Sequence, residues 1–277
     1  MIKVGFIGYG SMGSMLLEGF ISSGGLNPDE VIVSTRTKSK LETIKRQWDL
    51  IHIGQDNREV AQKAKYIFIC VKQSEVKNIL GEIKGATTPA THLISLAGSV
   101  SITNIERLIT GGVTKITPSI ASEVHDGITL ICHNQKVTKE DAAYIESLLG
   151  RISTVKIINE ADLELGIALT SCAPGFIAAL FQEFVDASLK YNKGFTKTEI
   201  EAMVLQTLLG TARLFLEKDM DFEEVITRVA TKGGLTEEGV KVLNAGLPEV
   251  FDEMFRETLN KRKKIAEMID NAYQEKG

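Results

Sequence analysis

The 277-residue chain contains little cysteine, histidine or tryptophan, with three, four and one residue of each kind. The cysteines, Cys70, Cys132 and Cys172, lie far apart and form no Cys-x-x-Cys pair, which argues against a disulfide framework and a zinc site. The histidines are scattered, without a His-Glu-x-x-His motif or Ser-His-Asp spacing. We therefore expect neither a metal centre nor a hydrolase triad.

The chain also has no strong excess of charge, since its net charge is −4. We find no apolar run that looks long enough to span a bilayer, and no basic segment followed by a long apolar stretch. These absences lead us to expect a cytoplasmic protein that binds neither nucleic acid nor a membrane.

A glycine-rich turn lies near the beginning of the chain. The apolar run Ile2–Ile7 leads into Gly8-Tyr-Gly-Ser-Met-Gly13, and apolar residues at helical spacing follow. In such a turn the first glycine permits the bend, the second lets the backbone approach a pyrophosphate, and the third lets the helix pack closely on the strand. The alternative is a glycine turn that serves packing alone. We expect a dinucleotide site held by Gly8, Gly10, Ser11, Met12 and Gly13.

The end of the next predicted strand, Val31–Ser34, bears on which cofactor is used. Sites that prefer NAD usually carry an acidic residue there, bonded to the ribose 2′-hydroxyl. This chain has Thr35 and Arg36 instead, with Lys38 close behind. Because a planar guanidinium suits a 2′-phosphate, we expect NADP(H) to be preferred over NAD(H). The alternative is that both cations are ordinary solvated charges.

Strand and helix patterns alternate through residues 1–160. Strands are expected at Lys3–Ile7, Val31–Ser34, Tyr66–Val71, His92–Ser95, Val113–Thr117, Ile128–Cys132 and Thr154–Ile158, and helices at Ser11–Ser22, Ser39–Gln47, Ser74–Ile83 and Lys139–Leu149. This alternation predicts an α/β Rossmann-type, doubly wound parallel sheet.

Residues 161–277 carry helical patterns alone. Helices are expected at Phe176–Tyr191, Lys197–Glu217, Asp221–Arg228, Glu237–Ala245 and Pro248–Tyr273. Three pairs have the spacing of helix caps: Ser39 with Glu42, Thr138 with Asp141, and Thr196 with Glu199. The basic cluster Lys261–Lys264 is interpreted as a solvated helix face.

Two of these helical segments, residues 175–191 and 202–216, are apolar on more than one face and so need to be buried. We infer an all-α dimerisation domain whose helices are covered by a second copy of the chain. The alternative is a compact all-helical domain with one central helix.

Polar or glycine-containing turns follow three of the predicted strands, at Cys70–Gln73, Ser95–Gly98 and Thr117–Ser119. Ligands of open α/β sheets bind outside the carboxyl ends of the strands, so we expect the cofactor and substrate crevice there. His125 is the one histidine expected near it.

Two further segments precede helices in the second half. Thr170–Gly175 either only initiates its helix or also binds an anion through exposed amides. Thr231–Thr236, with two glycines, a lysine and hydroxyls, has the composition of a carboxylate or phosphate nest.

Together, these motifs resemble the pyrroline-5-carboxylate reductase family over essentially the whole chain. The shared segments are GFIGYGSMG, CVKQ, SLAG, KITPSIA, LTSCAPGF and TKGGLTEEG, in the family's order. The resemblance implies NAD(P)H-dependent reduction of the cyclic imine 1-pyrroline-5-carboxylate to L-proline. It also implies a Rossmann domain over residues 1–160, a helical dimerisation and substrate-binding domain over residues 161–277, and dimers that in some members form decamers.

The resemblance further implies roles for single residues. It assigns the glycine turn to the pyrophosphate, Arg36 to the 2′-phosphate, and Val71, Lys72, Ala97 and Gly98 to the walls around the nicotinamide ribose. It assigns Gly233, Gly234 and Thr236 to the substrate carboxylate, with the Thr236 hydroxyl near the imine nitrogen as the catalytic contact. We add Ser119, Ser171, Cys172 and Lys232 to this substrate end.

The chain departs from the family pattern at the substrate end. Ser119 stands where the family has the asparagine of Met-Pro-Asn-Thr-Pro, Thr170–Gly175 replaces Ser-Gly-Ser-Gly-Pro-Ala, and Lys232 replaces the proline of Ser-Pro-Gly-Gly. These changes are similar to those of a divergent, competence-associated branch. Two alternatives stay open: a reductase of a related cyclic imine or oxo acid, and a reductase-like NADPH-binding regulatory protein with little turnover.

Overall fold

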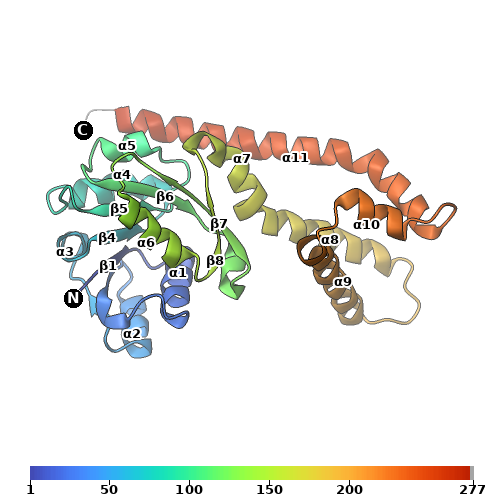
Figure 1. Ribbon diagram of the computed structural model, residues 1–277, viewed down its shortest axis with the longest axis horizontal. Helices are drawn as coiled ribbons and strands as arrows, with labels where there is room; N and C mark the ends of the chain where they lie inside the picture. The colour runs from blue at the N-terminus through green and yellow to red at the C-terminus, as the bar shows by residue number, and fades with distance from the viewer. Residues whose placement is uncertain (275–277) are drawn as a thin grey trace. The chain divides into compact units, whose positions relative to one another are not determined.

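The computed structural model describes residues 1–274, and its first half is built around one eight-stranded sheet (Figure 1). The strand order is β3-β2-β1-β4-β5-β6-β7-β8, and every neighbouring pair is parallel except β6 and β7. The strands are β1 (Val4–Ile7), β2 (Val31–Ser34), β3 (His52–Ile53), β4 (Tyr66–Ile69), β5 (His92–Ser95), β6 (Gly112–Thr117), β7 (Gly127–His133) and β8 (Ser153–Ile157).

Helices cover both faces of the sheet, which is why β1, β2, β4 and β5 are buried along their whole length. One core contains side chains of α1 (Ser11–Ser22), α2 (Lys38–Gln47) and α6 (Lys139–Leu149); the other contains side chains of α3 (Asn57–Lys63), α4 (Gln73–Ile83) and α5 (Ile102–Glu106). In the first core the rings of Phe6 and Phe68 stack at 4.9 Å. The predicted doubly wound α/β fold is confirmed.

The predicted parallel sheet contains one antiparallel pair. β7 runs antiparallel to β6, with Ile116 opposite Ile131. A parallel pair requires a crossover of a dozen or more residues, whereas residues 118–126 hold only the short 3-10 helix η2 (Ile120–Val124). The sequence prediction also missed β3, α3 and α5, whose short spans carry little periodic signal.

Two of the three predicted helix caps are confirmed. The side chains of Thr138 and Thr196 accept hydrogen bonds from the backbone N–H groups of Asp141 and Glu199. The cap predicted at Ser39 is wrong, because α2 begins one residue earlier, at Lys38.

The rest of the described chain is helical: η3 (Glu160–Asp162), α7 (Leu163–Ile167), the π-helical turn η4 (Ala168–Cys172), α8 (Ala173–Leu189), α9 (Lys197–Lys218), α10 (Phe222–Val229) and α11 (Leu235–Gln274). Two helices were predicted where α11 is continuous, so the predicted break before Pro248 is wrong. Proline removes one backbone hydrogen bond, and the 40-residue helix continues through this single loss.

The chain divides into two compact units that do not coincide with contiguous halves. One unit holds residues 1–174 together with the chain from Leu259 on, and the other holds Gly175–Thr258. The boundary expected at residue 160 therefore stays a prediction.

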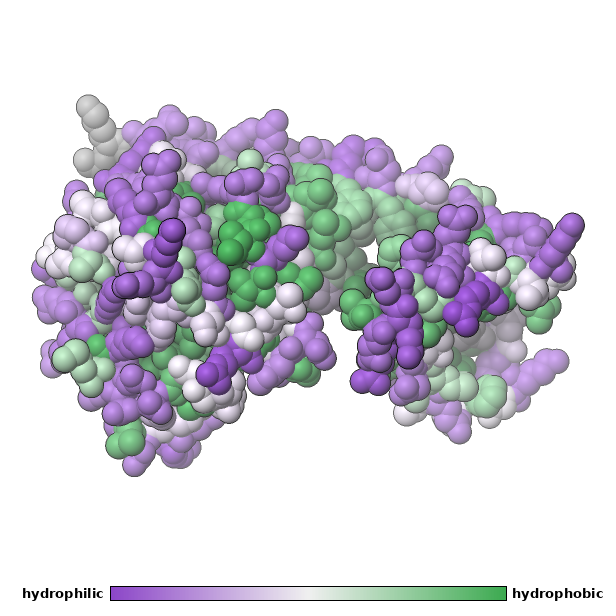
Figure 2. Space-filling view, viewed as in Figure 1, coloured by the Kyte–Doolittle hydropathy of each residue, from purple (hydrophilic) through white to green (hydrophobic). Residues whose placement is uncertain are grey.

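The helical stretch Glu160–Leu189 bears on the expected absence of a membrane-spanning segment. By its length, and by the mean hydropathy of 1.6 of its most apolar window, it could span a membrane, so the expectation that no run is long enough is wrong. Core helices of soluble proteins meet the same criterion. Only 11% of its most apolar window is buried within this chain, and hydrophobic residues also lie open on the surface of the unit Gly175–Thr258 (Figure 2).

Candidate functional site

A groove of about 790 Å³ lies at the carboxyl ends of β1, β2 and β4. β1 lies between β2 and β4. The chain runs outward from β1 to β2 and β3 and then crosses back to β4 on the other side of β1, and this change of direction opens a crevice at the end of β1. Six of the predicted cofactor residues line this groove: Gly8, Gly10, Thr35, Arg36, Val71 and Lys72.

The three glycines of the turn occupy three different environments. Gly8 has φ +99°, and a Cβ there would lie 2.6 Å from the carbonyl oxygen of Cys70. A Cβ on Gly13 would lie 2.7 Å from the carbonyl oxygen of Gly8. A Cβ on Gly10 would meet no atom within 4 Å, so Gly10 faces open space in the groove. The turn thus has two glycines required by packing and one that leaves room for a ligand.

The N-terminus of α1 fits an anion. Gly10 is its N-cap and supplies no side-chain acceptor to the first N–H groups of this 12-residue helix. These donors and the positive end of the helix dipole favour a phosphate group. The groove therefore suits the pyrophosphate of a dinucleotide.

Two groups of charged side chains line the groove, and we call them its basic and its acidic wall. Arg36, Lys38 and Lys40 come from the end of β2 and from α2 and make up the first, whereas Asp56, Glu75 and Glu82 lie before α3 and in α4 and make up the second. Arg36 Nη1 lies 3.0 Å from Glu75 Oε1, and the side chain of Arg36 is 89% exposed.

Ala97 and Gly98, predicted beside the nicotinamide, follow β5 and do not line this groove. Ala97 is buried in the core. The Gly98 carbonyl oxygen accepts hydrogen bonds from Lys115 Nζ at 3.1 Å and Arg262 Nη2 at 3.0 Å. Two cations therefore hold the backbone of this turn.

Sequence reasoning missed both of these cations. Lys115 is buried in β6 and is balanced by Glu160, whose Oε1 is 2.8 Å from Lys115 Nζ. A lysine in the middle of the predicted strand Val113–Thr117 was the available signal. Arg262 had been interpreted as a solvated charge, but burial lowers the pKa of its guanidinium.

Three predicted substrate residues lie in the same unit as the groove. Ser119 is buried at the start of η2, where its Oγ accepts a hydrogen bond from the Ala121 N–H. Ser171 Oγ donates to the carbonyl oxygen of Pro118 at 3.2 Å, which brings Ser171 beside Ser119. Ser171 and Cys172 belong to η4, and such π-helical turns are frequent at functional sites.

The remaining substrate residues lie in the other unit, Gly175–Thr258, where Lys232 and Thr236 are exposed. Gly233 has φ +74°, and its N–H donates to the carboxylate of Glu237 at 2.7 Å. The Gly234 N–H donates to the Thr231 carbonyl oxygen. Both amides predicted for a substrate carboxylate therefore have local partners, and one partner is itself a carboxylate, that of Glu237 in the first turn of α11.

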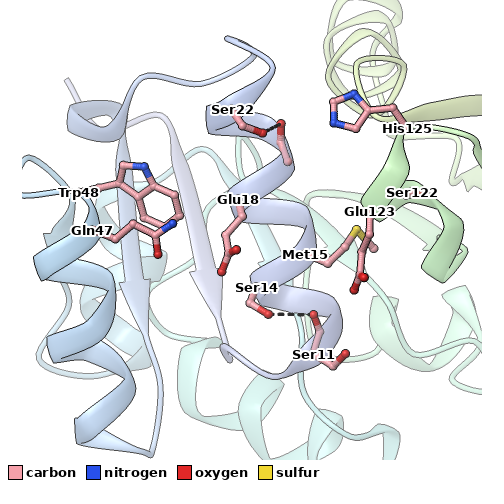
Figure 3. Close-up of a pocket in the computed structure, with 11 residues that line it drawn as sticks. Ser11, Ser14, Met15, Glu18, Ser22, Gln47, Trp48, Ser122, Glu123 and His125 are labelled. Carbon is pink, nitrogen blue, oxygen red and sulfur yellow. Dashed lines mark hydrogen bonds between the residues drawn. The ribbon is translucent and has the colours of Figure 1, made fainter.

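A second cavity, of about 450 Å³, lies along α1 (Figure 3). Its lining includes Ser11, which does not line the larger groove, and His125, which has φ +64° at the end of η2. Met12 packs against the core. Within residues 1–274 no three His, Cys, Asp or Glu side chains gather as a metal site would require.

Known proteins resemble this chain over nearly its full length. It is 34% identical over 271 residues to the Bacillus subtilis (strain 168) protein named pyrroline-5-carboxylate reductase 3, covering 97% of this chain and 98% of the relative. The chain belongs to the pyrroline-5-carboxylate reductase family. It is 28% identical to ComE operon protein 4 of the same organism, covering 93% of this chain and 94% of that protein.

Other comparisons agree with this family and its fold. Residues 160–265 match the model of the pyrroline-5-carboxylate reductase dimerisation domain, and residues 3–98 match the model described as NADP oxidoreductase coenzyme F420-dependent. The solved pyrroline carboxylate reductase of Plasmodium falciparum, with NADP bound, superposes with a TM-score of 0.81 at 21% identity, covering 97% of this chain and 98% of that one. As a pyrroline-5-carboxylate reductase family member, the chain is an oxidoreductase with a Rossmann-type NADP-binding domain.

Proposed function

We propose that this protein is a cytoplasmic enzyme that reduces 1-pyrroline-5-carboxylate to L-proline with NADPH. The observation that carries the proposal is the groove at Gly10 with free helix N–H groups, in a chain 34% identical to a pyrroline-5-carboxylate reductase. When bound, the nicotinamide would supply the hydride for C5 of the imine, whose nitrogen can be protonated beforehand, so that the product is the neutral amine. The three cysteines without a disulfide agree with a reducing compartment.

The protein's task in this reaction is chiefly positioning. Gly10 and the α1 N-terminus hold the pyrophosphate, while Val71, Lys72, Ala97 and Gly98 form the walls at the nicotinamide ribose. Lys232, Gly233 and Gly234 hold the substrate carboxylate in place of Glu237, and Thr236 contacts the imine nitrogen. Ser119, Ser171 and Cys172 complete the substrate end.

The proposal is tested by measuring NADPH oxidation with 1-pyrroline-5-carboxylate as the substrate. The control substrate is 1-pyrroline-2-carboxylate. Saturable turnover with the first substrate is expected. Thr236→Ala should lower kcat by about tenfold or more, without a comparable change in NADPH affinity, because a contact to the reacting nitrogen strengthens in the transition state. Equal kcat in the variant would remove Thr236 from the mechanism.

We also propose a preference for NADPH over NADH that depends on Arg36. Arg36→Ala should raise KM for NADPH by about tenfold while KM for NADH stays nearly constant, since only NADPH has a 2′-phosphate to lose a charge-assisted hydrogen bond. Steady-state kinetics with both cofactors measure this. An unchanged KM for NADPH would show that Arg36 is an ordinary surface charge.

The quaternary structure that we propose is a homodimer. The light-scattering measurement below also detects any assembly into higher oligomers. Support comes from the match of residues 160–265 to a dimerisation domain and from large apolar side chains exposed on α8 and α9, among them Phe184 and Leu205. Light scattering gives the mass directly, and a monomer at micromolar concentration would favour the alternative of a compact all-helical domain with one central helix.

A second candidate is a reductase of a related cyclic imine or oxo acid. It is favoured by Ser119 and Lys232 at the substrate end and by the carboxylate of Glu237, in the first turn of α11, bonded to the Gly233 N–H. Turnover of such compounds, with none of 1-pyrroline-5-carboxylate, would select it. NADPH binding without turnover on any of these substrates would select a regulatory role.

A further inference from the structure

The two walls of the nucleotide groove are joined by one ion pair. Arg36 follows β2, and Glu75 lies in the first turn of α4, so the 3.0 Å contact between them bridges elements 39 residues apart. Both residues line the groove together with Lys38 and Glu82.

Little free energy is needed to separate the Arg36–Glu75 ion pair. The side chains of Arg36 and Glu75 are 89% and 36% exposed, and an ion pair of this kind contributes little to stability. By contrast, Glu82 accepts a hydrogen bond from Asn57 Nδ2 at 2.6 Å, and Asn57 Oδ1 accepts one from Ser34 Oγ. Glu82 is thus held by a neutral network, whereas Glu75 is bonded to the cation that a 2′-phosphate needs.

We propose that Glu75 sets the cofactor selectivity by competing with the 2′-phosphate of NADP(H) for Arg36. The inference rests on the proposed role of Arg36. When NADPH binds, the guanidinium exchanges the Glu75 carboxylate for the phosphate, and the released carboxylate stays near a group of the same charge. NADH has no phosphate and requires no such exchange, so Glu75 narrows the difference in affinity between the two cofactors.

The test is the dissociation constant of each cofactor, measured by titrating the intrinsic fluorescence of NADPH or NADH with protein. Glu75→Gln should tighten NADPH binding about two- to fivefold, the range of an exposed ion pair, and leave NADH binding nearly unchanged. The gain should shrink at high ionic strength, because exposed charges are screened. Glu82→Gln is the matched control, because it removes a negative charge from the same acidic wall but leaves the carboxylate bonded to Arg36 in place.

A double-mutant cycle with Arg36→Ala identifies the cause. In the Arg36→Ala background the Glu75 substitution should give a clearly smaller gain in NADPH affinity, because only the repulsion between the carboxylate and the 2′-phosphate remains to be removed. Unchanged NADPH affinity in Glu75→Gln, or an equal gain in Glu82→Gln or without Arg36, would overturn the inference.

The same set of variants separates this inference from the proposed function. Weaker NADPH binding in Arg36→Ala combined with unchanged binding in Glu75→Gln rejects the role of Glu75 alone. Unchanged binding in Arg36→Ala rejects the proposed preference and the competition together.

Discussion

Gly10→Ala is expected to fold as the wild type does and to bind NADPH at least tenfold more weakly. Gly10 has φ −87° and ψ −168°, which alanine adopts readily, and its Cβ would meet no protein atom. Alanine is a poorer N-cap than glycine but has less conformational freedom in the unfolded chain, and these opposing effects are each about 1 kcal/mol or less. The added methyl group instead occupies the space where a pyrophosphate must approach the backbone.

Gly13→Ala is the matched variant, and it is expected to destabilise the fold, which Gly10→Ala does not. Its Cβ would lie 2.7 Å from the Gly8 carbonyl oxygen and 2.9 Å from Cys70 Cβ, so α1 must shift. Overpacking of this kind costs about 1–3 kcal/mol. Urea unfolding of both variants, with NADPH titration of each, measures the two effects. Wild-type NADPH affinity in Gly10→Ala would show that the pyrophosphate does not lie against this turn.

The free energy of unfolding is expected to fall by about 3 kcal/mol as the pH drops from 6.5 to 4, through one buried histidine. His92 is 1% exposed, and burial lowers its pKa from 6.5 to about 4, against a smaller raising effect of Asp141 and smaller lowering effects of His133 and Lys65. Between these values the unfolded chain binds a proton at this residue and the native chain does not. Stability is therefore complete above pH 6.5 and is lost as the pH falls.

A hydrogen-bonded chain links buried His92 to a second histidine. Its Nε2 lies 2.6 Å from Thr114 Oγ1, which lies 2.7 Å from His133 Nδ1, and burial also lowers the pKa of His133. Urea unfolding at several pH values would measure the loss. His92→Gln keeps a polar partner for Thr114 without the titration, so its stability should depend less on pH. An identical pH dependence in wild type and variant would locate the effect elsewhere.

The nucleotide half of the site could be predicted because its requirements are local. Each glycine of the turn has a steric reason that depends on the nearest strand and helix, and Arg36 lies directly after a predicted strand. The contact of Glu237 with Gly233 is local as well, and its four-residue spacing at a helix start was available as a signal.

The contacts around Gly98 could not be predicted in this way. Arg262 is 164 residues away in the sequence, and only the three-dimensional fold brings it to the Gly98 carbonyl. The antiparallel direction of β7 could in principle have been predicted, because the connection between β6 and β7 is too short for a parallel crossover. Pro248 was misleading because the proline rule describes a local cost, whereas a helix forms according to the sum of all its contacts.

The nucleotide-binding unit is completed by the last part of the chain. Asp270 accepts a hydrogen bond from Asn104 Nδ2 at 2.6 Å, Lys77 Nζ donates to the carbonyl of Ala272, and Ile269 packs against the core. During synthesis the sheet leaves the ribosome before the segment of α11 that contains Ile269 and Ala272. Part of the apolar surface of the nascent Rossmann unit therefore stays uncovered until this segment of α11 has been made.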